Sequence, residues 1–277
     1  VQNIAIEGSF DDCQSILKSV FSDLSFKEEH QLGAVNSVNW ARVLPQVIYY
    51  FSAYSQLGAP ATFQVAVPTG NFGNIFAGYV ARRMGLPIKQ LILATNQNDI
   101  LHRFFSSGVY QREEVHFSHS PAMDIQVASN FERYVYYELH EDSGKVREFM
   151  AAFNETGEAT IDRSLFDIEN AFISDRVNDP TTLSTIAQIH EETGYLLDPH
   201  TAVGVQVGRK HRSADLPLVC MATAHPAKFD QVIAESIPSL EVTHEKLEAV
   251  RDARTRKVML PANPQLIKQF IRNFQSG

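Results

Sequence analysis

The sequence predicts an α/β fold in which an open, twisted, mostly parallel sheet is flanked by helices. The first observation is a strand, turn, helix and strand over residues 62–95: TFQVAV and IKQLILA are apolar strands, and IFAGYVARRMG is the helix between them. The second is that the same order recurs in VQNIAIEGSF and the helix after it, and in CMATAHPAKF. Because parallel strands need crossover connections that are usually helical, this alternation favours a parallel sheet.

The composition is that of an ordinary soluble globular chain. Its 277 residues, 44% hydrophobic and 20% charged, are enough for one large domain or one and a half. A net charge of -8 and scattered basic residues argue against a nucleic-acid partner. No apolar stretch is long enough to span a membrane, and no signal-peptide pattern begins the chain. Cys13 and Cys220 form no CxxC pair, which favours two buried thiols in a reducing cytoplasm.

The first 58 residues predict a strand followed by helices. Ile4 and Ile6 alternate with small or polar residues, as if the chain began inside a strand. Ser9 is placed to cap the next helix. A further helix carries an apolar stripe that ends at Gly58, and Pro45 predicts either a kink or a fresh helix start within it.

Capping residues predict most of the later elements. Asn96 or Asn98 would cap a helix after the second strand of the crossover unit. Residues 110–180 predict only a loop followed by a core helix. Asp179 would cap a helix that ends at Gly194. The last part predicts a buried strand, PLVCMAT, and two amphipathic helices, THEKLEAVRDAR and PQLIKQFIRNF.

The turn VPTGNFGN, residues 67–74, is the strongest candidate for a ligand site. It lies between a strand and a helix N-terminus, where unpaired N–H groups favour anions. Gly70 and Gly73 are three residues apart and no lysine follows, so neither a Walker loop nor a GxGxxG motif fits. Backbone N–H groups and asparagine amides would instead hold a phosphomonoester. Pyridoxal phosphate is the first candidate, flavin mononucleotide the second, and a plain tight turn the alternative without a ligand.

A second turn of this kind follows the predicted strand PLVCMAT. Thr223 and His225 come after that strand, and Pro226 begins the next helix. Two turns at one sheet edge could share a ligand. A capping hydroxyl and a loop imidazole are at least as good an interpretation of Thr223 and His225.

Other polar groups give weaker indications. His116 and His119 form a single HxxH pair without a third ligand, so no metal site is expected. Asp198 most simply caps the helix that contains His200.

A polar cluster also precedes the helix that contains Pro45. Its members are Asn36, Ser37, Asn39 and Arg42. Such a cluster could hold an anionic substrate or could only cap a solvated helix start, and the pattern alone favours the cap.

Five blocks of the sequence resemble threonine synthase of the longer type, in the same order over nearly the whole chain. They are NSVNWARVLPQVIYYF, VPTGNFGNIFAGYVARRMGLPIKQLILATNQNDILHRFFSSGVY, SPAMDIQVASNFER, DPHTAVG and ATAHPAKF. The resemblance implies a pyridoxal phosphate enzyme of fold type II, similar to the tryptophan synthase β-subunit. It implies a cytoplasmic lyase of amino-acid biosynthesis that converts O-phosphohomoserine and water to threonine and phosphate.

The resemblance also implies roles for individual residues. The turn would hold the cofactor's phosphate through Gly70, Asn71, Phe72, Gly73 and Asn74. Thr223 would hydrogen-bond the pyridine nitrogen, and a neutral hydroxyl there should leave that nitrogen largely unprotonated. The polar cluster of Asn36, Ser37, Asn39 and Arg42 would contact the substrate, with Arg42 as the partner of a phosphate or carboxylate.

The sequence departs from the family at the catalytic centre. It contains neither an HGPT-x-x-x-KD type segment, which carries the Schiff-base lysine, nor an SGDTG type loop, which handles the substrate carboxylate. Since no lysine, Lys89 and Lys228 included, has that context, no catalytic residue is nominated. We therefore expect the chain to be the C-terminal part of the enzyme, incomplete at the N-terminus and inactive alone.

This interpretation predicts a domain organisation. Residues 1–35 would be a remnant of the smaller N-terminal domain, 36–58 a connecting helix, and 59–277 the large α/β domain that carries the phosphate loop. An apolar face left uncovered predicts self-association. The alternative functions are a non-catalytic module that binds a phosphorylated ligand and an enzyme resembling a serine or threonine dehydratase.

Overall fold

The computed structural model describes residues 2–8, 10–162 and 171–275, so Ser9, the expected helix cap, lies outside the described residues. Its contacts divide the chain into two units, each described by itself. One comprises Val1–Val35 with Glu248–Gly277, and the other is Asn36–Leu247. This division differs from the expected large domain of 59–277, because a strand of the C-terminal segment pairs with the N-terminal strand.

The smaller unit is built on that strand pair. β1 (Ile4–Glu7), predicted from the alternation, lies parallel to β8 (Val258–Pro261), which was not predicted. Helices α1 (Phe10–Ser22), α2 (Leu24–Glu29) and α13 (Pro264–Gln275) complete the unit. Apolar side chains from these helices form its core: Ile16, Val20, Phe26 and Ile267.

One of the two helices predicted at the end of the chain is wrong. THEKLEAVRDAR forms only a single helical turn, α12 (Glu245–Glu248), whereas α13 has the expected extent. Val250, on the expected apolar stripe, is 58% exposed. A short helix whose apolar face is not buried has little to stabilise it beyond its first turn.

A four-stranded parallel sheet forms the centre of the larger unit, as predicted. Its strands, in spatial order, are β6 (Phe172–Arg176), β3 (Ile88–Thr95), β2 (Phe63–Pro68) and β7 (Leu218–Cys220). All three pairings are parallel. Every residue of β2 is buried, which is typical of an inner strand covered on both faces.

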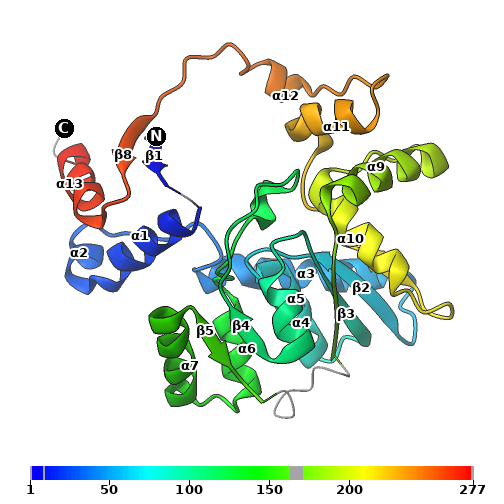
Figure 1. Ribbon diagram of the computed structural model, residues 1–277, viewed down its shortest axis with the longest axis horizontal. Coiled ribbons are helices and arrows are strands. Elements are labelled where there is room, and N and C mark those ends of the chain that lie inside the picture. Colours follow the sequence, from blue (N-terminus) through cyan, green and yellow to red (C-terminus); the bar gives the residue numbers. More distant parts are fainter. Residues whose placement is uncertain (1, 9, 163–170, 276–277) are drawn as a thin grey trace. The chain divides into compact units, whose positions relative to one another are not determined.

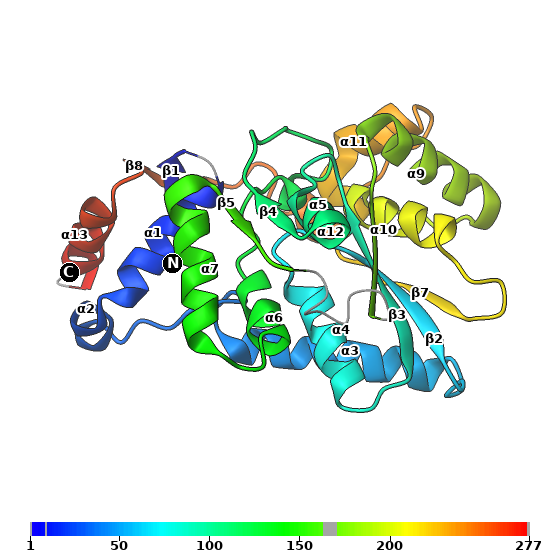
Figure 2. The ribbon, with the colours of Figure 1, turned by 60° about the horizontal axis from the view of Figure 1, so that its bottom comes forward.

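Helices cover both faces of β2 and β3 (Figures 1 and 2). The elements concerned are α3 (Trp40–Gln56) and α4 (Gly73–Arg83) on one side, and α10 (Pro199–Lys210), with α9 (Asp179–Thr193) packed on it, on the other. Alternate residues of β2 divide between the two layers. Val65 and Val67 belong to the core beneath α3 and α4, and Ala66 to the core beneath α10.

Two helix starts differ from the prediction by one to three residues. Asp99, rather than Asn96 or Asn98, is the N-cap of α5 (Ile100–Ser107). At α9 the N-cap is Asn178 rather than Asp179, because the Asn178 side chain accepts the Thr181 N–H at 3.0 Å.

Helix α3 is continuous. Asn39 caps it by accepting the Ala41 N–H at 3.0 Å, and Pro45 lies inside it without a second start. Inside the unit, Tyr50 of α3 faces α4: a Cβ on Gly78 would lie 2.6 Å from the Tyr50 ring. The Tyr50 hydroxyl lies 2.8 Å from the carbonyl oxygen of Asn74 in the first turn of α4. Burial raises the pKa of Tyr50, so this hydroxyl stays protonated and can donate.

The segment predicted only as a loop and a helix contains more structure. It forms β4 (Val109–Gln111), η1 (Pro121–Met123), α6 (Phe131–Glu138), α7 (Ser143–Thr156), β5 (Glu158–Thr160) and β6. β4 and β5 pair antiparallel. The sequence of β6, FISDR, is half polar because β6 is an edge strand, and this obscured it in the sequence.

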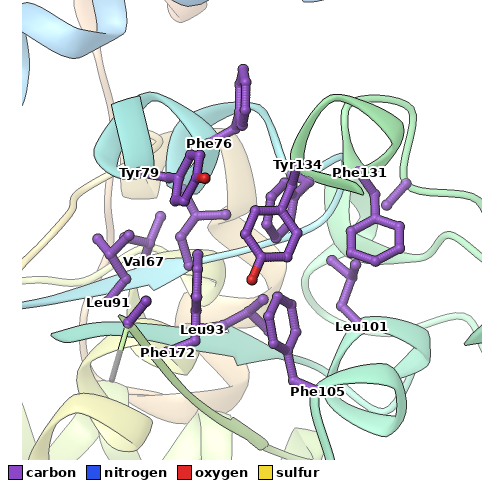
Figure 3. Packing of buried hydrophobic residues seen from close by; sticks show 14 of the residues in the cluster. Val67, Phe76, Tyr79, Leu91, Leu93, Leu101, Phe105, Phe131, Tyr134 and Phe172 are labelled. Carbon is purple, nitrogen blue, oxygen red and sulfur yellow. The ribbon is translucent and has the colours of Figure 1, made fainter. Parts of the chain in front are cut away.

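An aromatic cluster fixes the turn after β2 from its buried side. Phe72 is 1% exposed and has a φ of 63°, a left-handed conformation rare for a side chain of this size. Its ring lies 5.5 Å from Phe131 and 5.6 Å from Tyr134, and it stacks on Phe105 at 6.1 Å and on Phe172 at 6.3 Å. Figure 3 shows Phe105, Phe131, Tyr134 and Phe172 of this cluster. Burial of this ring therefore compensates for the strained backbone of the turn.

We expect Phe72→Ala to lower the free energy of unfolding of the larger unit by about 3–5 kcal/mol, since it leaves a cavity in this cluster. Phe117→Ala is the matched control, because Phe117 is 92% exposed. It should change stability by no more than about 0.5 kcal/mol. Urea unfolding followed by circular dichroism measures both. Equal midpoints for the two variants would contradict this account of the turn.

Candidate functional site

The turn from β2 to α4 has a glycine at the point of closest approach to another loop. A Cβ on Gly70 would lie 2.6 Å from the carbonyl oxygen of Ala122 and 3.2 Å from the Cα of Met123. From the sequence, Gly70 was expected to leave room for a ligand. The loop that carries Ala122 occupies that space, so the packing of the protein itself already requires a glycine here. The Phe72 N–H donates to the Gly70 carbonyl at 2.8 Å, so Phe72 contributes to the turn mainly through its ring.

The N-terminus of α4 opens directly from this turn. The first bond of its helical pattern runs from the Phe76 N–H to the Phe72 carbonyl at 3.0 Å, so the N–H groups of Gly73, Asn74 and Ile75 precede it. A Cβ on Gly73 would meet Asn130 at 3.4 Å and Ser37 at 3.5 Å, which are ordinary contacts. The protein's own packing therefore does not require glycine at position 73.

Asn130 joins the turn to the polar cluster before α3. Its buried amide nitrogen donates to the Asn71 carbonyl at 3.0 Å and to the Ser37 hydroxyl at 2.8 Å. Arg133 in turn donates to the Asn130 side-chain oxygen at 3.1 Å. Sequence reasoning missed Asn130; its place at the start of the aromatic-rich helix was the available signal.

The polar cluster of residues 36–42 has mainly local contacts. Asn36 accepts the Val38 N–H at 3.1 Å, and Asn39 caps α3. Arg42 is exposed in the first turn of that helix. Only Ser37, through Asn130, is connected by the hydrogen bonds above to the glycine turn, so substrate contact by the cluster stays a prediction.

The turn after β7 lies at the same sheet edge as the glycine turn. β2 and β7 are parallel neighbours with Ala66 opposite Cys220, so both turns follow carboxyl ends of adjacent strands. Thr223 is exposed, and its N–H donates to the Thr201 hydroxyl at 3.1 Å. His225 accepts the Ala227 N–H at 3.2 Å and caps η3 (Pro226–Phe229), in keeping with the interpretation of a loop imidazole.

Asp198 caps α10 as predicted, and it also reaches the turn after β7. It accepts the N–H groups of His200 and Thr201, the Thr201 hydroxyl and the Ala224 N–H. Burial raises the pKa of Asp198, but hydrogen bonds from His200 and Thr201 outweigh this and hold that pKa below its ordinary value. Asp198 is therefore an ionised acceptor that is 2% exposed.

Asn96 and Asn98 form a buried polar network instead of capping α5. The Asn96 amide donates to Asp124 at 2.7 Å and to Ser120 at 3.0 Å, while Asn98 donates to Asp124 at 3.0 Å. This network lies at the carboxyl end of β3 and fixes the loop that carries Ala122. It therefore supports the glycine turn indirectly.

Neither the HxxH pair nor the two cysteines belongs to a metal-binding group among the described residues. His119 pairs with Glu235 at 3.5 Å, and among the described residues no three His, Cys, Asp or Glu side chains are grouped to hold a metal ion. Cys13 and Cys220 are free and only partly buried, and burial raises the pKa of Cys220 to about 11. In the same described part, none of the helices has the length and hydropathy of a membrane span.

Known proteins resemble this chain in sequence and in backbone. Residues 201–271 match the family model "Threonine synthase, C-terminal". Threonine synthase of Pseudomonas aeruginosa is 50% identical over 85% of the chain and 51% of its own length, and that of Methylobacillus glycogenes is 42% identical over 97% and 58%. The crystal structure of PLP-bound threonine synthase from Brucella melitensis superposes with a TM-score of 0.86 at 43% identity, covering 99% of this chain and 59% of that one.

These likenesses confirm the expected fold type II architecture, and the chain spans about half to three fifths of the length of the proteins it matches. They agree with the five sequence blocks, which lie on the strands, turns and helices that build the candidate site. The chain is thus similar to threonine synthases over 85–99% of its own length, and its residues 201–271 match the C-terminal model of that family.

Proposed function

We propose that the larger unit provides the cofactor-phosphate site of a pyridoxal phosphate-dependent threonine synthase. One observation carries the proposal: the N-terminus of α4 presents neutral N–H donors beside a glycine, Gly73, that the protein's own packing does not require. A helix N-terminus framed in this way suits a phosphate monoester. The PLP named with the Brucella melitensis relative supports this choice over flavin mononucleotide.

The described residues fit the cofactor at two points. The N–H groups of Gly73 and Asn74, with the loop residues Gly70, Asn71 and Phe72 shaping the approach, would hold the phosphate. Thr223, exposed at the same sheet edge, would place its hydroxyl at the pyridine nitrogen. When bound, the cofactor supplies an electron sink for bond changes in the substrate.

We propose O-phosphohomoserine and water as substrates, with threonine and phosphate as products of a carbon–oxygen lyase reaction. Within this chain the candidates for substrate contact are Asn36, Ser37, Asn39 and Arg42. Arg42 is exposed, and its guanidinium is suited to a phosphate or carboxylate. Ser37 lies beside Asn130 and so borders the phosphate loop. We place the reaction in the cytoplasm.

The proposal predicts different outcomes at the two glycines of the turn. Gly73→Ala should fold normally, since its Cβ makes ordinary contacts, but should weaken binding of pyridoxal phosphate by about tenfold or more, because the methyl group occupies the anion site. Gly70→Ala should instead lower the unfolding midpoint, because its Cβ meets a backbone carbonyl.

Equilibrium dialysis against pyridoxal phosphate gives the affinity, and urea unfolding gives the stability. Gly33→Ala, where a Cβ would meet no atom within 4 Å, is the control for an added methyl group away from the site. Unchanged affinity in Gly73→Ala would refute the assignment of the phosphate site.

We also propose that the isolated chain has no turnover. A base positioned at the substrate's Cα is needed for proton transfer, and the lysine segment typical of the family does not occur in these 277 residues. Incubation of the purified chain with pyridoxal phosphate and O-phosphohomoserine should release neither threonine nor phosphate. Release of both, in proportion to the amount of chain, would overturn this statement.

Self-association is the last part of the proposal. The exposed side of α3 carries Leu44, Ile48 and Tyr49, which are 52%, 64% and 53% exposed. Contiguous apolar surface of this kind favours contact between copies. Light scattering should give a mass above the 31.1 kDa of one chain. Leu44→Glu with Ile48→Glu should restore the monomer mass, while Phe117→Glu, at an isolated exposed residue, should not; a monomeric unmodified chain would contradict the proposal.

A further inference from the structure

Asp198 connects the two turns that the proposed function assigns to one ligand. It is 2% exposed, and its neighbours His200 and Thr201 are 5% and 3% exposed, so the group is closed to solvent. We infer that Asp198 is a positioning residue that fixes the glycine turn and the Thr223 turn relative to each other, through one arm on each side. The inference depends on the proposed function only for its effect on cofactor binding.

The first arm runs through His200 to the glycine turn. Asp198 lies 3.0 Å from Nδ1 of His200, and Nε2 of His200 accepts the Ala122 N–H at 3.1 Å. Since Nε2 is an acceptor, the imidazole hydrogen must lie on Nδ1, where it donates to Asp198. The carbonyl of the same Ala122 is the group that fills the space beside Gly70. His200 also packs edge-on against Phe229 at 5.0 Å, which fixes its ring.

The second arm runs through Thr201 to the turn after β7. The Thr201 hydroxyl has one hydrogen, and its close contact with Asp198 takes it, so Thr201 can only accept from other groups. It does accept the Thr223 N–H at 3.1 Å, while Asp198 itself accepts the Ala224 N–H at 3.3 Å. The Thr223 hydroxyl lies 3.4 Å from Thr201, too far for a strong bond, which leaves it available to a ligand.

The direction of every bond in the two arms is set by the negative charge of Asp198. An ionised carboxylate accepts without donating, so both neighbours turn their hydrogens toward it and present acceptors outward. An asparagine at this position would keep the helix cap, because asparagine and aspartate are about equally good at the N-cap. It would, however, place an NH2 group where one arm needs an acceptor. Asp198→Asn therefore separates the positioning role from the capping role.

The test is amide hydrogen exchange, followed by NMR, on the chain without ligand. Asp198→Asn should speed exchange about tenfold or more at Thr223 and Ala224, because the Thr201 hydroxyl and the Ala224 N–H both bond Oδ2, where the NH2 group would lie. Exchange at Ala122 should stay slow, because the amide oxygen that keeps the cap also keeps the bond from His200. His200→Phe should speed exchange only at Ala122. Thr201→Val should act only at Thr223, because the Ala224 N–H donates to Asp198, and Thr201→Ser should restore slow exchange at Thr223.

The results that would support the inference differ from those that would overturn it. Uniformly faster exchange throughout the larger unit in Asp198→Asn, or equal effects of His200→Phe and Thr201→Val on both turns, would overturn the inference in favour of a purely structural residue. Dialysis with pyridoxal phosphate is then the second readout. Loss of affinity in Asp198→Asn with branch-specific exchange supports the positioning role at the cofactor site. Branch-specific exchange in a chain that binds no pyridoxal phosphate would keep the inference about the two turns and reject the proposed function.

Discussion

The site depends on the parallel alignment of β2 with β7. Because the two strands run in the same direction with Ala66 opposite Cys220, their following turns emerge at one edge of the sheet. An antiparallel neighbour would have placed Thr223 at the opposite edge. Helices on both faces bury β2 completely. A shift of one residue in register would therefore turn Val65 and Val67 away from the core that they now fill. Strand direction and register together therefore decide which polar residues can meet.

The chemistry at this edge relies on neutral groups. The candidate phosphate donors are main-chain N–H groups and the turn is shaped by glycine, asparagine and phenylalanine. The nearby arginine, Arg133, holds Asn130 and the Val38 carbonyl instead of pointing a free charge into the turn. Neutral donors bind a phosphate without adding a positive charge that would also attract other anions. The buried carboxylate of Asp198 orients the residues that support the two turns. The arrangement favours a fixed geometry over strong electrostatic attraction.

The sequence predicted the inner part of the fold well and the connections less well. β2, α4 and β3 were predictable because their apolar periodicity is unbroken and Gly85 ends the helix. β6 was not predictable, since an edge strand is less buried than an inner one and its sequence, FISDR, is half polar. The local cap at Asp198 could be predicted from Asp-Pro, but its reach to Ala122 could not, because no sequence pattern shows that a residue 78 positions earlier folds against His200. Asn130 was missed for the same reason: its partners, Ser37 and Asn71, are distant in the chain.

The left-handed Phe72 has an implication for how such a loop can change during evolution. Its conformation is held by rings on the interior side, whereas the atoms that would meet a ligand belong to the exterior side of the same few residues. Selection acting on the exterior could thus replace Gly73, where a Cβ makes only ordinary contacts, and alter ligand preference while the interior ring keeps the backbone path. Asn74 is less free to change, because its side-chain oxygen accepts the Tyr50 hydroxyl at 2.7 Å. A substitution of Phe72 would instead remove the support for this backbone path, and with it any ligand preference that depends on the path.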